Sequence, residues 1–223
     1  MMTNLFSVFD PSSSIVGLPL NWFSMFIGLG VMPLWYWMTP SRSLFLFKQL
    51  YSLMYREMEL LLGKGRSSWI MMFLALFMFI VLNNSAGLLP WVFTASSHLV
   101  FTVSLALPLW LGYFLMGWAT NLIHMLAHLV PHGTPGALMP FMVLIESVSS
   151  LIRPGTLAVR LAANMIAGHL LLTLLSGAIS LTSVFSMITI LMSQIALLML
   201  EVAVAVIQSY VFAILSSLYA SEV

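Results

Sequence analysis

Two long runs of this sequence contain no charged residue, and they constrain the fold more than any other feature. Residues 67–145 form a run of 79 without Asp, Glu, Lys or Arg, and residues 161–200 form another run of 40. A membrane-spanning helix needs about 20 apolar residues, so each run can hold a complete span. The composition, with 61% hydrophobic and 6% charged residues, is too apolar for a single soluble domain. We therefore predict an all-α integral membrane protein.

The apolar segments predict five membrane spans in a single membrane domain, 1–223. The spans cover residues 15–37, 68–89, 99–118, 141–175 and 183–219. At about 1.5 Å per residue the last two would measure roughly 53 and 55 Å, whereas the hydrocarbon core is only about 30 Å thick. We expect a long antiparallel hairpin that is strongly tilted, protruding, or kinked at Pro154 and Gly155.

The connection after the first span differs in charge from the rest of the chain. Residues 42–66 carry five of the seven basic and two of the six acidic residues, with apolar side chains at helical spacing. This pattern predicts an amphipathic helix on the membrane surface, or an ordinary amphipathic connector. The positive-inside rule places it on the inner side, so that the N-terminus lies outside and the C-terminus inside. Polar and turn-forming residues mark the turn after the second span: Asn83, Asn84, Ser85, Gly87 and Pro90.

Arg160 is a permanent cation in apolar sequence, with Arg153 and Glu201 as its nearest charged neighbours. A charged group at the centre of a bilayer costs about 3 kcal/mol on insertion scales, so it is interpreted first as functional. Arginine also keeps its proton there, because the guanidinium group is always charged in proteins. Whatever acts beside Arg160 must therefore work next to a fixed positive charge.

Polar residues recur along the predicted hairpin. Two residues at the same depth in an antiparallel hairpin have a nearly constant sum of residue numbers, which pairs Arg160 with Gln208, His169 with Glu201 and Glu146 with Glu222. Arg160 and His169 are nine residues apart and project to opposite sides of an ideal helix. This spacing suggests a cation facing a neighbour and a titratable pair lining a wet cavity on the outer side. Imidazole and carboxylate can exchange protons near neutral pH, although a satisfied buried pair and a helix–helix hydrogen bond from Gln208 are alternatives.

Other motifs are weaker. His124, His128 and His132 have the spacing of a metal-ligating or haem-ligating stripe, but Pro131 interrupts the helix that the stripe would need. We expect an interfacial loop there, and no metal and no cofactor in the chain. The sequence contains no cysteine, which excludes disulfides and thiolate sites.

One stretch of the chain carries a family resemblance. Arg160-Leu161-Ala162-Ala163-Asn164 is followed by Gly168-His169 and, in the last span, by Glu201 and Gln208. This pattern resembles subunit a, also called subunit 6, of mitochondrial F-type ATP synthases. A second segment, Asn83 with Gly87-Leu88-Leu89-Pro90, is similar to another motif of that family.

The resemblance implies a multi-pass stator of the mitochondrial inner membrane, with its N-terminus toward the intermembrane space and its C-terminus toward the matrix. Its partners would be a rotor ring of c subunits with mid-membrane carboxylates, the peripheral stalk, other membrane-sector subunits, the lipid bilayer and the transported protons, with no nucleic acid. The chain would not be an enzyme by itself. It would instead conduct protons for ATP synthesis elsewhere in the complex.

The resemblance also implies a role for each site residue. Arg160 would face the ring, His169 and Glu201 would line an outer half-channel, Asn164 and Gln208 would support the region near Arg160, and Glu146 would serve an offset inner half-channel. Small residues would let the ring approach closely: Ala162, Ala163, Ala167 and Gly168.

Two other classes of function remain compatible with the residues. An autonomous ion channel or secondary transporter would also place charges within the membrane, although the chain lacks the paired broken segments of inverted repeats. A structural subunit of a respiratory complex is the other alternative.

Overall fold

A computed structural model describes residues 9–12, 19–31, 39, 41–63, 67–89, 92–130, 135–179 and 184–221. Within these ranges the chain is helical and contains no strand, as expected for an all-α membrane protein. The elements are η2 (Leu20–Phe23), α1 (Ser24–Val31), α2 (Arg42–Leu62), α3 (Ser67–Gly87), η3 (Ala95–Ser97), α4 (Leu99–Thr120), α5 (Leu122–His128), η4 (Gly136–Leu138), α6 (Met139–Ile179) and α7 (Val184–Ser221).

Four helices in the described part of the chain are long and apolar enough to cross a membrane: α3, α4, α6 and residues Ser186–Ser221 of α7. Of the span predicted at 15–37, the structure describes residues 19–31, which include η2 and α1; its other residues lie outside the described ranges. Pro90, His132 and Glu222 also lie outside them.

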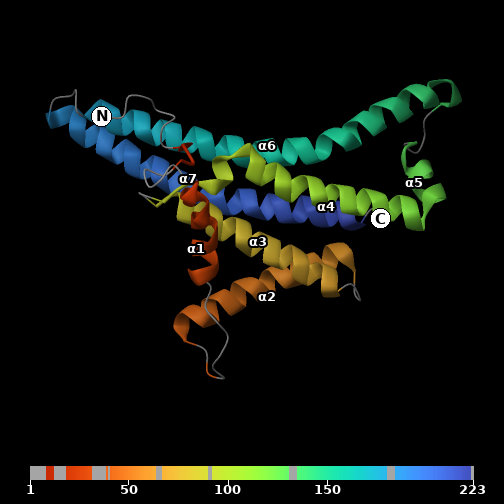
Figure 1. The fold of residues 1–223 in the computed structure, drawn as a ribbon, viewed down its shortest axis with the longest axis horizontal. Coiled ribbons are helices and arrows are strands. Elements are labelled where there is room, and N and C mark those ends of the chain that lie inside the picture. The colour runs from red at the N-terminus through yellow and green to blue at the C-terminus, as the bar shows by residue number, and fades with distance from the viewer. Residues whose placement is uncertain are drawn as a thin grey trace.

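Helix α3 lies at the centre of the packing. It contacts α1, α2 and α7, and in Figure 1 it lies between α2 and α7. Its side chains Phe73, Leu74 and Ile80 are fully buried. The expectation that Asn83 and Asn84 mark a turn was wrong, because α3 continues through both residues and ends at Gly87. Both amides are buried inside the bundle.

Helix α2 is an amphipathic helix attached to the bundle. The hydroxyl of Ser41 caps its first turn by accepting a hydrogen bond from the Leu44 N–H at 3.4 Å. The helix ends at Leu62 and is capped by Gly63, whose φ of +83° is a conformation that favours glycine. Its apolar side packs on α3 and α7, with Met58 fully buried. The hydroxyl of Tyr210 in α7 donates a hydrogen bond of 2.7 Å to Glu57, which further fixes α2 to the long hairpin.

The two longest helices, α6 and α7, form the hairpin that carries the candidate site. They contain 41 and 38 residues and pack against each other, while α4 packs mainly on α6. Figure 1 shows α6 as a bowed helix that diverges from α4 toward the end near α5. Pro154, which removes a backbone donor, lies inside α6 and is buried. A cavity lined by residues of α4 and α6 lies at the end of the molecule that carries Glu146.

Candidate functional site

Arg160 projects from the exposed side of α6. No carboxylate among the described residues forms an ion pair with it. Ala163 and Ala167, one and two turns further along α6, are exposed with it, whereas Ala162 is only 1% exposed. Of the four small residues expected beside Arg160, two therefore share its exposed side, while Ala162 and Gly168 take part in packing within the chain. A guanidinium in this position needs a counter-charge or water from outside the described chain.

Asn164 connects α6 to α7 one turn from Arg160. Its side-chain amide donates a hydrogen bond of 3.0 Å to the Oε1 atom of Gln208. Gln208 is 5% exposed, and its own Nε2 has no partner among the described residues. The hairpin register thus joins Gln208 to Asn164 by a hydrogen bond, whereas the sequence predicted Arg160 at the level of Gln208.

Glu201 is a buried carboxylic acid that approaches the backbone of α6. Its side chain is 7% exposed, and neither carboxylate oxygen has a hydrogen-bond partner within the described ranges. A Cβ atom added to Gly168 would lie 2.6 Å from Oε1 of Glu201, so a larger residue there would force the Glu201 side chain to shift. Buried polar groups are almost always hydrogen-bonded to protein or water, and a buried charge without a partner is costly. The carboxyl group therefore requires water or a mobile proton donor.

His169, the next residue of α6, lies at the same level of the hairpin. Its ring hydrogen-bonds to the backbone of Gly87 at the end of α3 and makes an edge-on contact with Phe9, with ring centroids 6.2 Å apart. Its Nε2 atom is buried without a partner in the described part of the structure. Glu201 and His169 are therefore neighbours that are not hydrogen-bonded to each other, and a satisfied buried pair is not what the structure shows.

An exposed acid lies next to this histidine contact. Asp10 follows Phe9, and the backbone N–H and hydroxyl of Ser12 donate hydrogen bonds of 3.0 and 2.8 Å to its carboxylate. These two bonds lower the pKa of Asp10, so this carboxylate keeps its negative charge at neutral pH. The fold thus holds an anion close to the histidine end of the hairpin.

Asn84 of α3 adds a further polar group that the sequence did not point to. It is fully buried, and its amide donates a 3.4 Å hydrogen bond to the carbonyl of Ala205, which lies between Glu201 and Gln208 on α7. Its Oδ1 atom has no partner among the described residues. Polar groups from three helices, α3, α6 and α7, thus converge along one side of α7. The sequence did contain a signal for this site, because two adjacent amide side chains are costly in an apolar membrane helix and are therefore candidates for a function.

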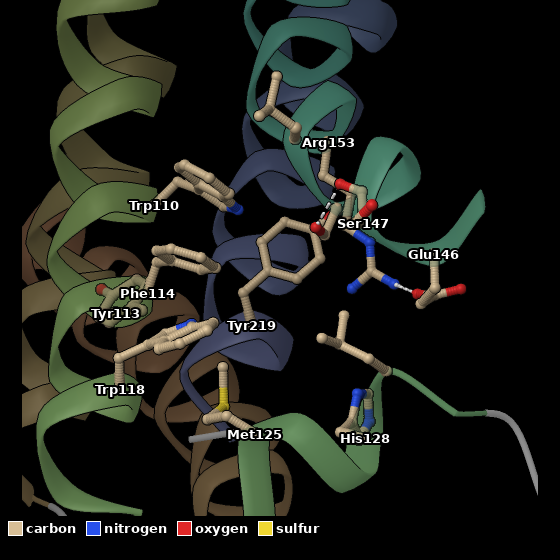
Figure 2. Close-up of a pocket in the computed structure, with 13 residues that line it drawn as sticks. Trp110, Tyr113, Phe114, Trp118, Met125, His128, Glu146, Ser147, Arg153 and Tyr219 are labelled. Atoms are coloured by element: carbon tan, nitrogen blue, oxygen red, sulfur yellow. Dashed lines mark hydrogen bonds and ion pairs between the residues drawn. The ribbon is translucent and has the colours of Figure 1, made fainter. Parts of the chain in front are cut away.

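Glu146 lies near the start of α6, far along that helix from Gly168, the residue that Glu201 of α7 contacts. Its Oε1 atom forms an ion pair of 3.0 Å with Arg153, and the guanidinium of Arg153 lies 5.5 Å from the ring centre of Tyr219. Figure 2 shows these side chains around a cavity of about 280 Å³ between α4, α5, α6 and α7. Glu222, the predicted neighbour of Glu146, is outside the described residues.

Comparisons with known proteins match the sequence of this chain to one family. The family model described as ATP synthase A chain matches residues 18–221. The chain belongs to the ATP synthase subunit a family. ATP synthase subunit a of Anopheles gambiae is 56% identical over 225 residues, and that of Drosophila melanogaster is 56% identical over 224 residues. Both alignments cover 100% of this chain and 100% of the relative, which confirms the resemblance seen in the sequence.

The histidine stripe predicted at residues 124, 128 and 132 does not form a metal site among the described residues. The loop expected at these histidines was wrong for His124 and His128, which both lie in the short helix α5, whereas His132 lies outside the described residues. No group of three potential metal ligands occurs among the residues that the structure covers. The polar groups that come together are those of α3, α6 and α7.

Proposed function

We propose that this chain is the proton-translocating stator of an ATP synthase membrane sector, with Arg160 facing the carboxylates of a rotor ring. The observation that carries the proposal is the exposure of Arg160 on α6 without an ion pair among the described residues. Glu201 and Gln208, by contrast, are turned into the bundle. A permanent cation at membrane depth calls for an anionic partner, and a ring of mid-membrane carboxylates would supply one.

The proposed topology has five spans, the N-terminus toward the intermembrane space and the C-terminus toward the matrix. Lengths of 41 and 38 residues for α6 and α7 support a strongly tilted hairpin, because straight helices of that size would measure roughly 57 to 62 Å. The basic residues of α2 support an inner location for the connection between the first two spans. A curved, tilted hairpin would also follow the wall of a ring.

The outer half-channel would lead past His169 to Glu201. Both groups have buried polar atoms without partners, and such atoms are suited to hydration and proton exchange. Asn84, Asn164 and Gln208 would extend the polar wall from Glu201 toward Arg160. The inner half-channel would begin near Glu146, at the opposite end of α6.

The proposed cycle keeps the two half-channels separate. A proton from the outer side passes through the outer half-channel and neutralises a ring carboxylate, which can then move into lipid as the ring turns. After nearly a full turn the carboxylic acid reaches the inner half-channel and releases its proton there. Arg160 repels excess positive charge and thereby blocks a direct leak between the channels. Each charge that crosses 100 mV contributes about 2.3 kcal/mol, so several protons are needed for each ATP.

The experiment that tests this function replaces Arg160 in the assembled complex. Arg160→Ala and Arg160→Lys are expected to abolish coupled ATP synthesis while assembly survives, because lysine carries the charge without the guanidinium fork. Arg42→Ala, at the exposed start of α2, removes a cation away from the hairpin and should leave synthesis intact. Normal synthesis in both Arg160 variants would favour a scaffold, and proton conduction by the isolated chain would favour an autonomous channel.

A further inference from the structure

The cavity between α4 and α6 has one aromatic wall and one polar wall. Trp110, Phe114 and Trp118 follow one another along α4, the first two stacked with ring centroids 5.0 Å apart and the last two tilted at 5.7 Å. Figure 2 shows these rings opposite Arg153 and Glu146 of α6, with Tyr219 of α7 between the two walls. Ser147 and Ser150 also line the α6 wall. A space of about 280 Å³ with several polar groups can hold a cluster of water molecules.

The polar wall belongs to a longer stripe on α6. Glu146, Arg153 and Arg160 follow one another at intervals of seven residues, which is nearly two helical turns. Side chains at this spacing project from almost the same side of a helix and are separated by about 10 Å along its axis. The stripe leads from the cavity toward the exposed cation of the proposed rotor-facing surface. Arg153 therefore lies midway between the proposed inner acid and Arg160.

Arg153 is held from two directions. The Glu146 carboxylate lies 3.0 Å from its Nη2 atom, and the Tyr219 ring lies beneath its guanidinium at 5.5 Å. The two charged side chains are 30% and 28% exposed, so the pair is not sealed inside the chain. Such an ion pair adds little to stability, but it fixes the position of the carboxylate on the cavity wall. Stacking on a tyrosine ring also limits the conformations that the arginine can adopt.

We propose that Arg153, held by Tyr219, is a positioning residue of the inner half-channel that fixes the ionised Glu146 carboxylate on the wall of a hydrated cavity. This inference rests on the proposed function and deepens it. A ring carboxylic acid would pass its proton through water in the cavity to the Glu146 carboxylate. Glu146 would then give the same proton to water of the inner compartment and return to the anion. Arg153 carries no proton at any step, because its guanidinium stays protonated.

Other titratable groups also face the cavity and must be considered in a pH experiment. His128 approaches from α5, Tyr113 from α4 and Tyr219 from α7, while Arg153 shares α6 with Glu146. Among these neighbours, a histidine is the group that can change charge near neutral pH. A variant of Arg153 must therefore be compared in a background where His128 is retained and in one where His128→Gln removes its titration.

The test measures ATP synthesis by the intact complex in vesicles while the inner and outer pH are varied separately. As the inner pH is lowered, synthesis by Arg153→Gln should fail at a higher inner pH than synthesis by the unmodified complex. The inner pH of half-maximal synthesis should rise by about 0.5 to 1 unit. The reason is that Arg153→Gln removes the cation that lies 3.0 Å from the carboxylate and fixes it on the cavity wall. The outer pH profile should not move, and Arg153→Lys should recover at least half of the shift. The shift should persist in the His128→Gln background.

Tyr219 provides a second test that leaves both charges in place. Tyr219→Phe keeps the ring and should behave as the unmodified complex, whereas Tyr219→Leu should shift the inner profile in the same direction as Arg153→Gln. If Arg153→Gln does not assemble, this pair decides the question. Arg42→Gln on α2 is the control for loss of one positive charge and should leave both profiles unchanged.

Unchanged inner pH profiles in both Arg153→Gln and Tyr219→Leu would overturn the inference. A smaller amount of assembled complex whose inner pH profile is unchanged would overturn it as well, because that result indicates a role in assembly alone. The Arg160 variants separate this failure from failure of the proposed function. If Arg160→Lys abolishes synthesis while Arg153→Gln leaves the inner profile unmoved, only the positioning role is wrong. If Arg160→Lys synthesises ATP normally, the stator function itself fails.

Discussion

The carboxyl group of Glu201 in α7 lies directly against Gly168 in α6, at a place where a Cβ atom would come within 2.6 Å of Oε1. This contact brings a buried acid next to His169 without a hydrogen bond between the two side chains. The absence of a side chain at residue 168 therefore allows the Glu201 carboxyl group to take this position against α6. The proposed outer half-channel depends on this close approach.

Gly168→Ala should disturb the acid more than it disturbs the helix. The added methyl group would push the Glu201 side chain or separate α6 from α7, at a cost of about 1–3 kcal/mol, and passive proton conduction through the membrane sector should fall. Gly177→Ala in the same helix is the matched control, because a Cβ there meets nothing within 4 Å. That variant should conduct protons normally and gain up to about 1 kcal/mol in helix stability. Equal conduction by the two variants would contradict the packing argument.

Glu201→Gln should slow proton uptake from the outer side. The amide has nearly the shape of the acid but cannot accept and release a proton, so proton flux should drop on the order of 10- to 100-fold. The measurement is flux through the membrane sector at saturating driving force, with the amount of assembled complex determined in parallel. An unchanged flux would argue against Glu201 as part of the outer half-channel.

Asn84→Ala should affect proton flux more than Asn83→Ala. Asn84 donates its hydrogen bond across to α7, whereas the amide of Asn83 donates within α3 to the Phe79 carbonyl at 2.9 Å. Loss of either hydrogen bond should reduce stability by about 0.5–1.5 kcal/mol. Only loss of Asn84 should also remove a polar group from the wall beside Glu201. The two variants should therefore lose similar thermal stability, whereas proton flux should fall only in Asn84→Ala.

Asn164 and Gln208 should act as a coupled pair. Asn164→Ala, Gln208→Ala and the double variant form a mutant cycle across the 3.0 Å hydrogen bond. Because both single changes remove the same interaction, the double variant should be less impaired than the sum, with a coupling energy of about 0.5–1.5 kcal/mol. Strict additivity in the rates of coupled synthesis would show that the bond has no role in the hairpin.

Asp10→Asn should lower proton capture on the outer side by no more than about twofold, because a single exposed charge acts mainly by steering. The hydrogen bonds from Ser12 lower the pKa of Asp10, so the acid remains ionised throughout the neutral range and the difference should not vary there with outer pH. High salt should remove the difference by screening. A persistent effect in high salt would indicate a structural role for this segment.

The hydrophobic pattern and the rare charges made much of the fold and site predictable. Uncharged runs longer than 20 residues indicate helices by composition alone, and a cation within apolar sequence is visible without any structure. The constant-sum rule placed His169 level with Glu201, and the structure packs the adjacent Gly168 against that acid. The same rule placed Gln208 level with Arg160, and the structure joins Gln208 by a hydrogen bond to Asn164, one turn further along α6.

What the sequence could not show depends on contacts between distant segments. Asn84 and Ala205 are 121 residues apart, and asparagine is also a common turn residue, so local propensity pointed to a turn. The approach of Tyr219 to Arg153 likewise depends on how α7 crosses α6. Both contacts depend on tertiary packing, which no local sequence pattern predicts.

The most direct measurement of the central claim is a map of the assembled complex that resolves side chains around Arg160. The account predicts that the guanidinium points from α6 toward a ring carboxylate and lies within about 6 Å of it, a range in which opposite charges influence each other strongly. A guanidinium that points into lipid, or back into the helices of its own chain, would contradict the proposed stator mechanism.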